Sequence, residues 1–240
     1  MSSSDLASGR DRYTTWLLHD SRKTPTLLAL FAVVAIALTG CGESAESGSD
    51  KQLDANGCTV AEMPAAKSVD VSPPSTQLDP NKTHVVTMST NCGEFKIKLD
   101  AKNNPRTASS FAHLVEEGVY DGTWFHRIVP DFVIQGGDPN ADGSGGSGYD
   151  IVEPPTGQYR IGTVAMAKTA NDPAGNSSSQ FYVVIGEDGT DLPPDYAIAG
   201  DVSDGEDVIE RIARYAPGEA SDGAPSGVAI IEKASVSTSE

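Results

Sequence analysis

Apolar and polar residues alternate in a series of short runs from residue 84 onward. The runs HVVTMST and EFKIKLD are separated by NCG, an arrangement that predicts a β-hairpin. Five similar runs follow the hairpin, namely WFHRIV, FVIQG, TVAMAK, QFYVVI and YAIAGDV, and a sixth, GVAIIEKA, lies near the end of the chain. Many short strands separated by turn residues are typical of an all-β domain.

Two segments instead follow the 3.6-residue period of a helix. The first, NPRTASSFAHLVEEGVY, has Asn104 as its expected N-cap, Pro105 at the first helical position and Gly118 as the stop. The second, GEDVIERIARYA, precedes the last strand. We therefore predict a mainly β fold, namely a closed eight-stranded antiparallel β-barrel capped by two α-helices.

The N-terminal residues have the pattern of an export signal. Arg22 and Lys23 precede the apolar run LLALFAVVAIAL, which is shorter than the roughly 20 residues of a membrane-spanning helix. The next residues, LTGC, resemble the lipobox of bacterial lipoproteins. We predict a signal peptide over residues 1–40 and a lipid on Cys41, which would anchor an extracytoplasmic protein to the cell membrane. An uncleaved anchor with an unmodified Cys41 is the alternative.

Residues 41–82 are rich in Ser, Ala, Pro, Asp and Glu and show no sustained apolar period. This composition predicts a flexible tether, followed by a folded domain over residues 83–240. The two remaining cysteines, Cys58 and Cys92, form an even pair in a chain expected to be exported, which favours a disulfide. Two buried free thiols are the alternative.

The charge of the chain limits its partners. The formal net charge is −17 and the sequence pI is near 4.5. Such a balance argues against binding a nucleic acid backbone through charge, and neutral or cationic peptides are better partners. We expect no metal, no cofactor and a monomeric protein.

Four motifs, in this order and spacing, resemble the cyclophilin family of peptidyl-prolyl isomerases: FHRIVPDFVIQGGDP, GTVAMAK, SSSQFYVVIG and DVSDGEDVIERIA. The resemblance covers roughly His84 to the C-terminus. It implies a barrel with a proline-binding groove on its outer face. Isomerisation needs an apolar seat for the proline ring and a fixed donor near the prolyl nitrogen, and an arginine suits that role.

Carried over residue by residue, the resemblance makes Arg127 the catalytic donor and Gln135 the residue that orients it. The residues that would bind the substrate are Phe132, Val133, Met166, Ala167, Gln180, Tyr182, Leu192 and Tyr196. Phe132, Val133 and Tyr182 have an alternative interpretation as core residues, and Arg127 has one as a surface charge.

The sequence departs from the common family pattern around the expected pocket. Asp191 stands where many members have tryptophan, and Ala199 stands where a phenylalanine is usual. Tyr196 replaces a histidine, Tyr182 a phenylalanine and Lys168 an asparagine. We expect these changes to alter the shape of the pocket while leaving the arginine and the glutamine in place.

Other motifs are weaker. DPNADG begins like a calcium-binding loop, but Tyr149 stands where the bidentate glutamate should be. His126 with Ser177, Ser178 and Ser179 could suggest a hydrolase, but no G-x-S-x-G motif is present. Two functions therefore remain open: an isomerase that acts on exported proteins, or a non-catalytic module or holdase that binds proline-containing polypeptides.

Overall fold

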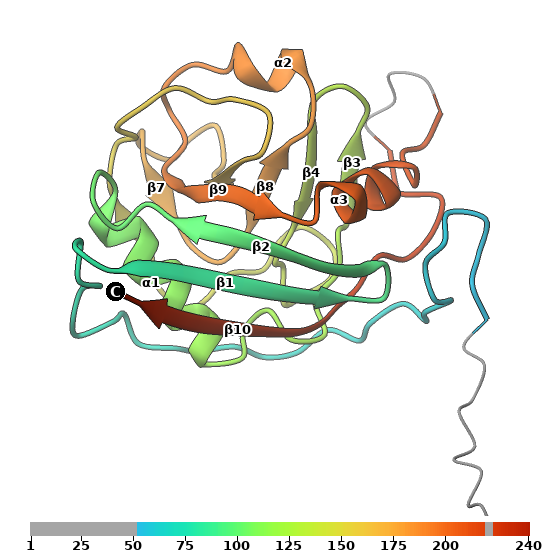
Figure 1. Cartoon of the computed structure of the whole chain (residues 1–240), viewed down its shortest axis with the longest axis horizontal. Coiled ribbons are helices and arrows are strands. Elements are labelled where there is room, and N and C mark those ends of the chain that lie inside the picture. Colours follow the sequence, from blue (N-terminus) through green and yellow to red (C-terminus); the bar gives the residue numbers. More distant parts are fainter. Residues whose placement is uncertain (1–51, 219–222) are drawn as a thin grey trace, which may run out of the picture. The chain divides into compact units, whose positions relative to one another are not determined.

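Short strands make up most of the regular structure (Figure 1). The computed structural model describes residues 52–218 and 223–240. Its strands are β1 (Thr83–Thr90), β2 (Gly93–Leu99), β3 (Arg127–Val129), β4 (Val133–Gly136), β5 (Ile151–Val152), β6 (Thr163–Met166), β7 (Asn176–Ser177), β8 (Phe181–Val184), β9 (Ile198–Asp204) and β10 (Ile231–Ser239). Its helices are α1 (Pro105–Glu116), α2 (Glu187–Thr190) and α3 (Glu206–Ala213).

Eight antiparallel strands form one curled sheet in the order β10-β1-β2-β9-β6-β8-β4-β3. The prediction of a closed barrel is wrong, because the edge strands β3 and β10 do not pair in the described part of the chain. The segment just before β3 does contact the start of β10, through an isolated bridge between Trp124 and Ile230 and backbone hydrogen bonds that join residues 122–125 to residues 229–231. Since β3 has three residues, it offers too few backbone groups for a continuous ladder, and the sheet stays open on that side.

The sheet encloses the main hydrophobic core. In β1 every second residue is buried, and Val86 and Met88 are fully inside. Phe111 of α1 adds an aromatic ring to this core and packs edge-on against Phe181 of β8. The two longer helices cover different parts of the sheet: α1 lies against β9 and β10, whereas α3 lies against β2.

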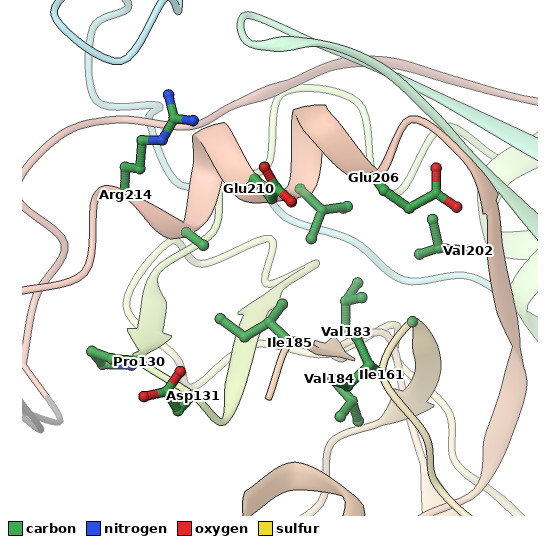
Figure 2. A pocket seen from close by; sticks show the side chains of 13 residues that line it. Pro130, Asp131, Ile161, Val183, Val184, Ile185, Val202, Glu206, Glu210 and Arg214 are labelled. Carbon is green, nitrogen blue, oxygen red and sulfur yellow. The ribbon is translucent and has the colours of Figure 1, made fainter. Parts of the chain in front are cut away.

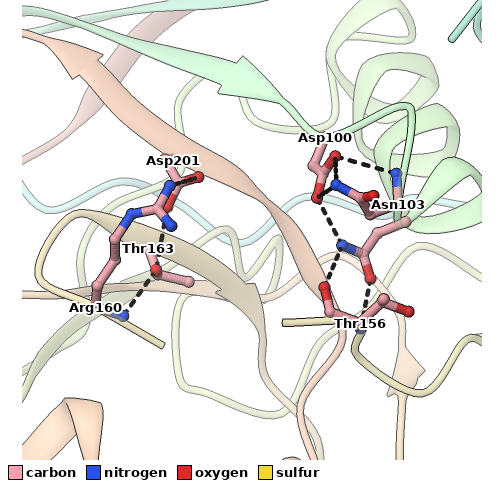
Figure 3. Close-up of polar contacts among 7 residues, drawn as sticks. Asp100, Asn103, Thr156, Arg160, Thr163 and Asp201 are labelled. Atoms are coloured by element: carbon pink, nitrogen blue, oxygen red, sulfur yellow. Dashed lines mark hydrogen bonds and ion pairs between the residues drawn. The ribbon is translucent and has the colours of Figure 1, made fainter. Parts of the chain in front are cut away.

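Helix α1 begins where the sequence predicts, but Asn104 does not cap it through its side chain. The Asn104 amide instead bonds to Asp100 and Thr156, which are labelled in Figure 3. Its Nδ2 donates to Asp100 Oδ2 at 2.9 Å, and its Oδ1 accepts the N–H of Thr156 at 3.0 Å. The fully buried side chain of Asn104 therefore joins the start of the helix to the loop that precedes β6. At the other end Gly118 adopts a φ of +69°, which suits a glycine at a helix stop.

The strands β4, β6 and β8 are buried on both faces of the sheet. Their inward residues, among them Ile134, Val164 and Phe181, belong to the main core. Their outward residues, among them Val133 and Tyr182, belong to a second, smaller cluster on the outer face. Because side chains alternate along a strand, these mostly apolar runs place apolar side chains on both faces of the sheet. This second cluster is where the candidate site lies.

Residues 52–82, which we call the N-terminal arm, lie against the domain instead of forming a free tether. Apart from an isolated bridge between Leu53 and Thr59, the arm has no regular secondary structure. Its backbone donates hydrogen bonds to Pro139 and Ser147 in the domain. Proline-rich segments remain extended because proline has no N–H for a helix or ladder, but they can still dock through other groups. The boundary at residue 83 stays a prediction.

A disulfide joins Cys58 of the arm to Cys92 in the hairpin between β1 and β2, the pair that the sequence predicts. Both cysteines are buried. The predicted signal peptide, residues 1–40, and the predicted lipid site, Cys41, lie outside the described residues. Within the described ranges, no helix is both long and apolar enough to cross a membrane.

We predict that replacing both Cys58 and Cys92 by alanine lowers the free energy of unfolding by about 3–4 kcal/mol, since the disulfide closes a loop with a sequence separation of 34. Denaturant unfolding at equilibrium measures this loss. The parent protein treated with a reductant should show the same loss. Peptide mapping of the unreduced protein that found both thiols free would show that this pairing is wrong.

Candidate active site

A cavity of about 280 Å³ opens on the outer face of the sheet. The residues that line it come from β3, β4 and β8 and from the segments that follow β6 and α2. They are Arg127, Phe132, Val133, Gln135, Ala167, Lys168, Tyr182, Leu192 and Tyr196. The structure thus brings together most of the side chains that the sequence assigns to a proline-binding site, although they are spread over 70 residues of the chain.

Strand register accounts for this convergence. Arg127 of β3 lies opposite Gln135 of β4, which in turn lies opposite Tyr182 of β8. Tyr182 lies opposite Ala165 of β6. Directly opposed residues in antiparallel strands share a face of the sheet, so these four side chains form one row across the outer surface. A shift by one residue would move the whole row into the core.

The arginine is held by a chain of hydrogen bonds. Its Nη1 donates to Gln135 Oε1 at 3.3 Å, and Gln135 Nε2 donates to Gln180 Oε1 at 3.0 Å. Gln180 Nε2 donates to the carbonyl oxygens of Gly143 and Gly145, both at 2.9 Å. The guanidinium also lies 5.8 Å from the centre of the Phe132 ring. A planar fork held at these points keeps a fixed orientation beside the apolar wall.

Gly137 keeps the turn after β4 compact. Its φ is +78°, and a Cβ there would lie 2.8 Å from both the Phe181 ring and the Ser179 carbonyl oxygen. No other residue fits this position without displacing the core. The Gly-Gly-Asp sequence after Gln135 therefore serves to bring the chain away from the site.

Two predicted site residues lie elsewhere. Met166 belongs to the main core and is 1% exposed, because the alternation along β6 points its side chain inward. Only its backbone could face a substrate. Gln180 does not line the cavity, and it acts on the site through its hydrogen bond to Gln135.

Two of the departures from the family pattern lie outside the cavity wall. Ala199 is fully buried in the main core, because its neighbour Ile198 takes the outward position on β9. Asp191 is the C-cap of α2, directly before the lining residue Leu192. The expectation that these two residues reshape the cavity is therefore not supported by their positions.

Lys168, noted in the sequence only as a departure, forms part of the rim. Its side chain is 4% exposed, and its Nζ lies 2.8 Å from Asp195 Oδ2 and 5.4 Å from the centre of the Tyr196 ring. The hydrogen bond to Asp195 raises the pKa of Lys168. Asp195 and Tyr159, which the sequence did not single out, hold the rim residues Lys168 and Tyr196. Tyr159 OH donates to Tyr196 O at 2.8 Å and accepts from Tyr196 N at 2.9 Å.

Tyr182 forms much of the apolar wall and packs edge-on against Tyr196, with ring centres 5.6 Å apart. Its hydroxyl is buried and has no hydrogen-bond partner in the described part of the protein. Burial raises the pKa of Tyr182 far above its ordinary value, so the hydroxyl stays neutral. The ring supplies the wall, while the hydroxyl adds an unsatisfied polar group.

The alternative motifs find other roles. Asp138 is fully buried, and its carboxylate accepts hydrogen bonds from the backbone N–H groups of Asn140, Asp142, Gly143 and Gly145. The calcium-like sequence is therefore a loop whose backbone is held by the Asp138 side chain. Burial lowers the pKa of His126, which keeps its ring neutral near pH 7. In the described ranges the hydroxyls of Ser178 and Ser179 bond to groups other than His126.

A larger cavity, about 540 Å³, lies between α3 and the sheet (Figure 2). It has an aliphatic wall that includes Ile161 and Ile185, and carboxylates at Glu206 and Glu210. None of the sequence-predicted site residues lines it. We take the smaller cavity as the candidate active site, because the sequence-predicted residues line it and Arg127, held by Gln135, lies there beside an apolar wall.

Comparison with known proteins identifies the family. Residues 85–236 match the family model described as cyclophilin type peptidyl-prolyl cis-trans isomerase/CLD. This chain belongs to the cyclophilin family. Its similarity extends to cyclophilins of known structure: a Cryptosporidium parvum cyclophilin type peptidyl-prolyl cis-trans isomerase has a TM-score of 0.59 and 28% identity, covering 66% of this chain and 99% of that one. A second structure of that protein, in the presence of the dipeptide ala-pro, gives a TM-score of 0.58.

Curated cyclophilin relatives include peptidylprolyl isomerase cyp7 of Schizosaccharomyces pombe, 40% identical over 117 residues. That match covers 46% of this chain and 25% of the relative. Peptidyl-prolyl cis-trans isomerase-like 1 of Mus musculus is 36% identical over 146 residues, which cover 58% of this chain and 83% of the relative. A bacterial relative, "Probable peptidyl-prolyl cis-trans isomerase B" of Mycobacterium tuberculosis, is 35% identical over 159 residues, which cover 58% of this chain and 50% of the relative.

We predict that Tyr182→Phe raises the free energy of unfolding by about 1 kcal/mol, because it removes an unsatisfied buried hydroxyl and keeps the ring. Tyr159→Phe is the matched control. It should lower stability, since the Tyr159 hydroxyl makes two hydrogen bonds with the backbone of Tyr196. Urea unfolding of the two variants measures both effects. A loss of stability in Tyr182→Phe would mean that its hydroxyl does have a partner.

Proposed function

We propose that this cyclophilin accelerates cis/trans rotation about Xaa-Pro bonds in exported polypeptides, and that it works outside the cytoplasm as a lipid-anchored monomer. The observation that carries the catalytic part is the guanidinium of Arg127, oriented by Gln135 at the edge of an apolar cavity. The family match over residues 85–236 supports the same reaction class.

The chemistry needs no covalent step. Rotation about an Xaa-Pro bond faces a barrier of about 18–20 kcal/mol, because amide resonance resists twisting. As the bond twists, the prolyl nitrogen becomes pyramidal and regains its lone pair. A donor that bonds this nitrogen only in the twisted state lowers the barrier without strengthening ground-state binding.

The cavity can hold the proline ring of the substrate next to the guanidinium of Arg127. Phe132, Tyr182 and Leu192 offer the apolar contacts for the pyrrolidine ring. Arg127 and Gln135 lie on the same lining, where Gln135 can also bond the substrate backbone. Because the hydrogen-bond chain fixes the guanidinium before substrate arrives, little reorganisation is needed in the twisted state.

Export is supported by the sequence before the domain. Arg22 and Lys23, the short apolar run and the LTGC sequence together form the pattern of a lipoprotein signal. The disulfide between Cys58 and Cys92 suits an oxidising compartment. Exported polypeptides that fold there contain Xaa-Pro bonds whose uncatalysed isomerisation takes tens to hundreds of seconds, so a local isomerase would have clear substrates.

Arg127→Ala should slow isomerisation about 10²–10³-fold, the usual cost of losing one preorganised donor. Peptide affinity should change much less, because the apolar wall remains. Gln135→Ala should give a smaller loss of rate, since Gln135 orients the charge but does not supply it. Exchange NMR on a short Xaa-Pro peptide measures the rate, and titration of the same peptide measures the affinity.

Equal turnover by Arg127→Ala and the parent would contradict the catalytic role of this arginine. A parent that binds the peptide but does not turn it over would instead support the alternative function, a non-catalytic proline-binding module or holdase. Circular dichroism of each variant shows whether the fold persists.

Cys41→Ser should carry no lipid and should keep residues 1–40, because serine has no thiol to take the diacylglycerol that precedes cleavage, whereas the parent should begin at a lipidated Cys41. Expression of the full chain in a bacterial host, followed by membrane fractionation and mass spectrometry of the N-terminal peptide, tests this prediction. Cys92→Ser is the matched control and should stay in the membrane fraction. If the parent protein itself kept residues 1–40 and had an unmodified Cys41, the uncleaved-anchor alternative would be correct.

A further inference from the structure

The N-terminal arm precedes the residues that match the family model, 85–236, yet it contacts a loop beside the active site. We call residues 138–149 the glycine-rich loop. Lys67 of the arm donates its backbone N–H to Pro139 O at 2.9 Å, and Val71 donates its N–H to Ser147 O, also at 2.9 Å. The arm is thus bonded near both ends of this loop.

The contact between arm and loop is close. Gly148 has a φ of +92°, and a Cβ added there would lie 2.8 Å from Asp70 Oδ1 and 3.1 Å from Asp70 Cα. The Val71 side chain packs against the main core. Backbone bonds and side-chain packing therefore fix the arm on the outer side of the loop.

The same loop supports the catalytic arginine from its inner side. The carbonyl oxygens of Gly143 and Gly145 accept both hydrogen bonds of Gln180 Nε2. Gln180 Oε1 accepts the hydrogen bond of Gln135, and Gln135 Oε1 accepts that of Arg127. A continuous series of contacts thus runs from the arm through the loop to the guanidinium.

The arm is also anchored away from the loop. Lys67 Nζ donates to Gly118 O at 3.1 Å and to Asp121 O at 2.5 Å, beyond the end of α1. The Cys58–Cys92 disulfide fixes the arm near its start. Burial lowers the pKa of Lys67, and the nearby charge of Asp121 acts in the opposite direction. A segment held at several points can restrain the loop that it contacts.

We infer that the N-terminal arm is a positioning element of the active site: by holding the glycine-rich loop, it sets the orientation of Gln180, Gln135 and, through them, Arg127. This inference rests on the isomerase activity proposed above. Substrate does not contact the arm in this account. The arm should therefore affect turnover and leave the apolar seat for the proline ring unchanged.

Val71→Pro tests the inference in the full chain, because proline lacks the N–H that bonds Ser147 O. Val71→Ile is the matched control, since it keeps both the N–H and the aliphatic packing. Mutations along a network of contacts typically change the coupling free energy between the two sites that it joins by about 0.5–2 kcal/mol. We therefore expect turnover to fall about 2–30-fold in Val71→Pro. Affinity for an Xaa-Pro peptide, measured by titration, should stay within about twofold.

A second readout does not depend on activity. The side-chain amide NMR signals of Gln135 and Gln180 should shift and exchange faster with water in Val71→Pro, and stay unchanged in Val71→Ile. Lys67→Met, which keeps the backbone N–H and loses the two Nζ bonds, should move the same signals in the same direction. If Val71→Pro does not fold, Lys67→Met is the variant that tests the inference.

Parent-like turnover together with parent-like amide signals in the folded variants would overturn the inference. A parent protein without turnover would refute the proposed function instead, and the amide signals would still test the coupling between arm and site. A fall in affinity equal to the fall in turnover would also contradict the inference, because it would show a general disturbance of the cavity.

Discussion

The structure depends on three strands, β4, β6 and β8, that must be buried on both faces. On the inner side, Ile134, Val164 and Phe181 complete the main core. On the outer side, Val133 and Tyr182 form a second buried cluster, and half-buried side chains from the loops, such as Leu192, pack against it. These loop side chains leave an apolar cavity over the cluster, and such a cavity is a natural binding site for an apolar ligand group. The same pairing that builds the sheet therefore creates the site.

The polar part of the site relies on the same sheet. Arg127 and Gln135 are cross-strand neighbours, so strand pairing fixes the backbone that carries the guanidinium. Beyond the sheet, its orientation depends on loops: Gln180 joins Gln135 to the glycine-rich loop, and the arm lies behind that loop. Lys168 and Tyr159 restrain Tyr196 on the opposite rim. A rotation reaction without covalent chemistry suits such a site, because orientation is what the protein supplies.

Local patterns in the sequence predicted the elements well, since α1, α3 and the longer strands follow apolar periods and turn residues. The family motifs led to the outer row of side chains, which strand alternation and register then bring together. Sheet closure was not predictable, because it depends on whether the three residues of β3 reach β10. The docking of residues 52–82 was not predictable either. Its hydrogen bonds use the backbone N–H groups of residues such as Val71, and amino-acid composition does not show where backbone groups bond. Tyr159 and Asp195 act through contacts with Tyr196 and Lys168 that exist only in the folded chain.

The central claim is that the outer cluster, and not the larger cavity beneath α3, receives the proline ring. Intermolecular NOEs between a bound Xaa-Pro peptide and the protein test it most directly. The proline ring protons should show NOEs to Phe132, Tyr182 and Leu192 of the smaller cavity. NOEs to Ile161, Ile185 and Ile209 of the larger cavity, with none to the smaller one, would contradict it.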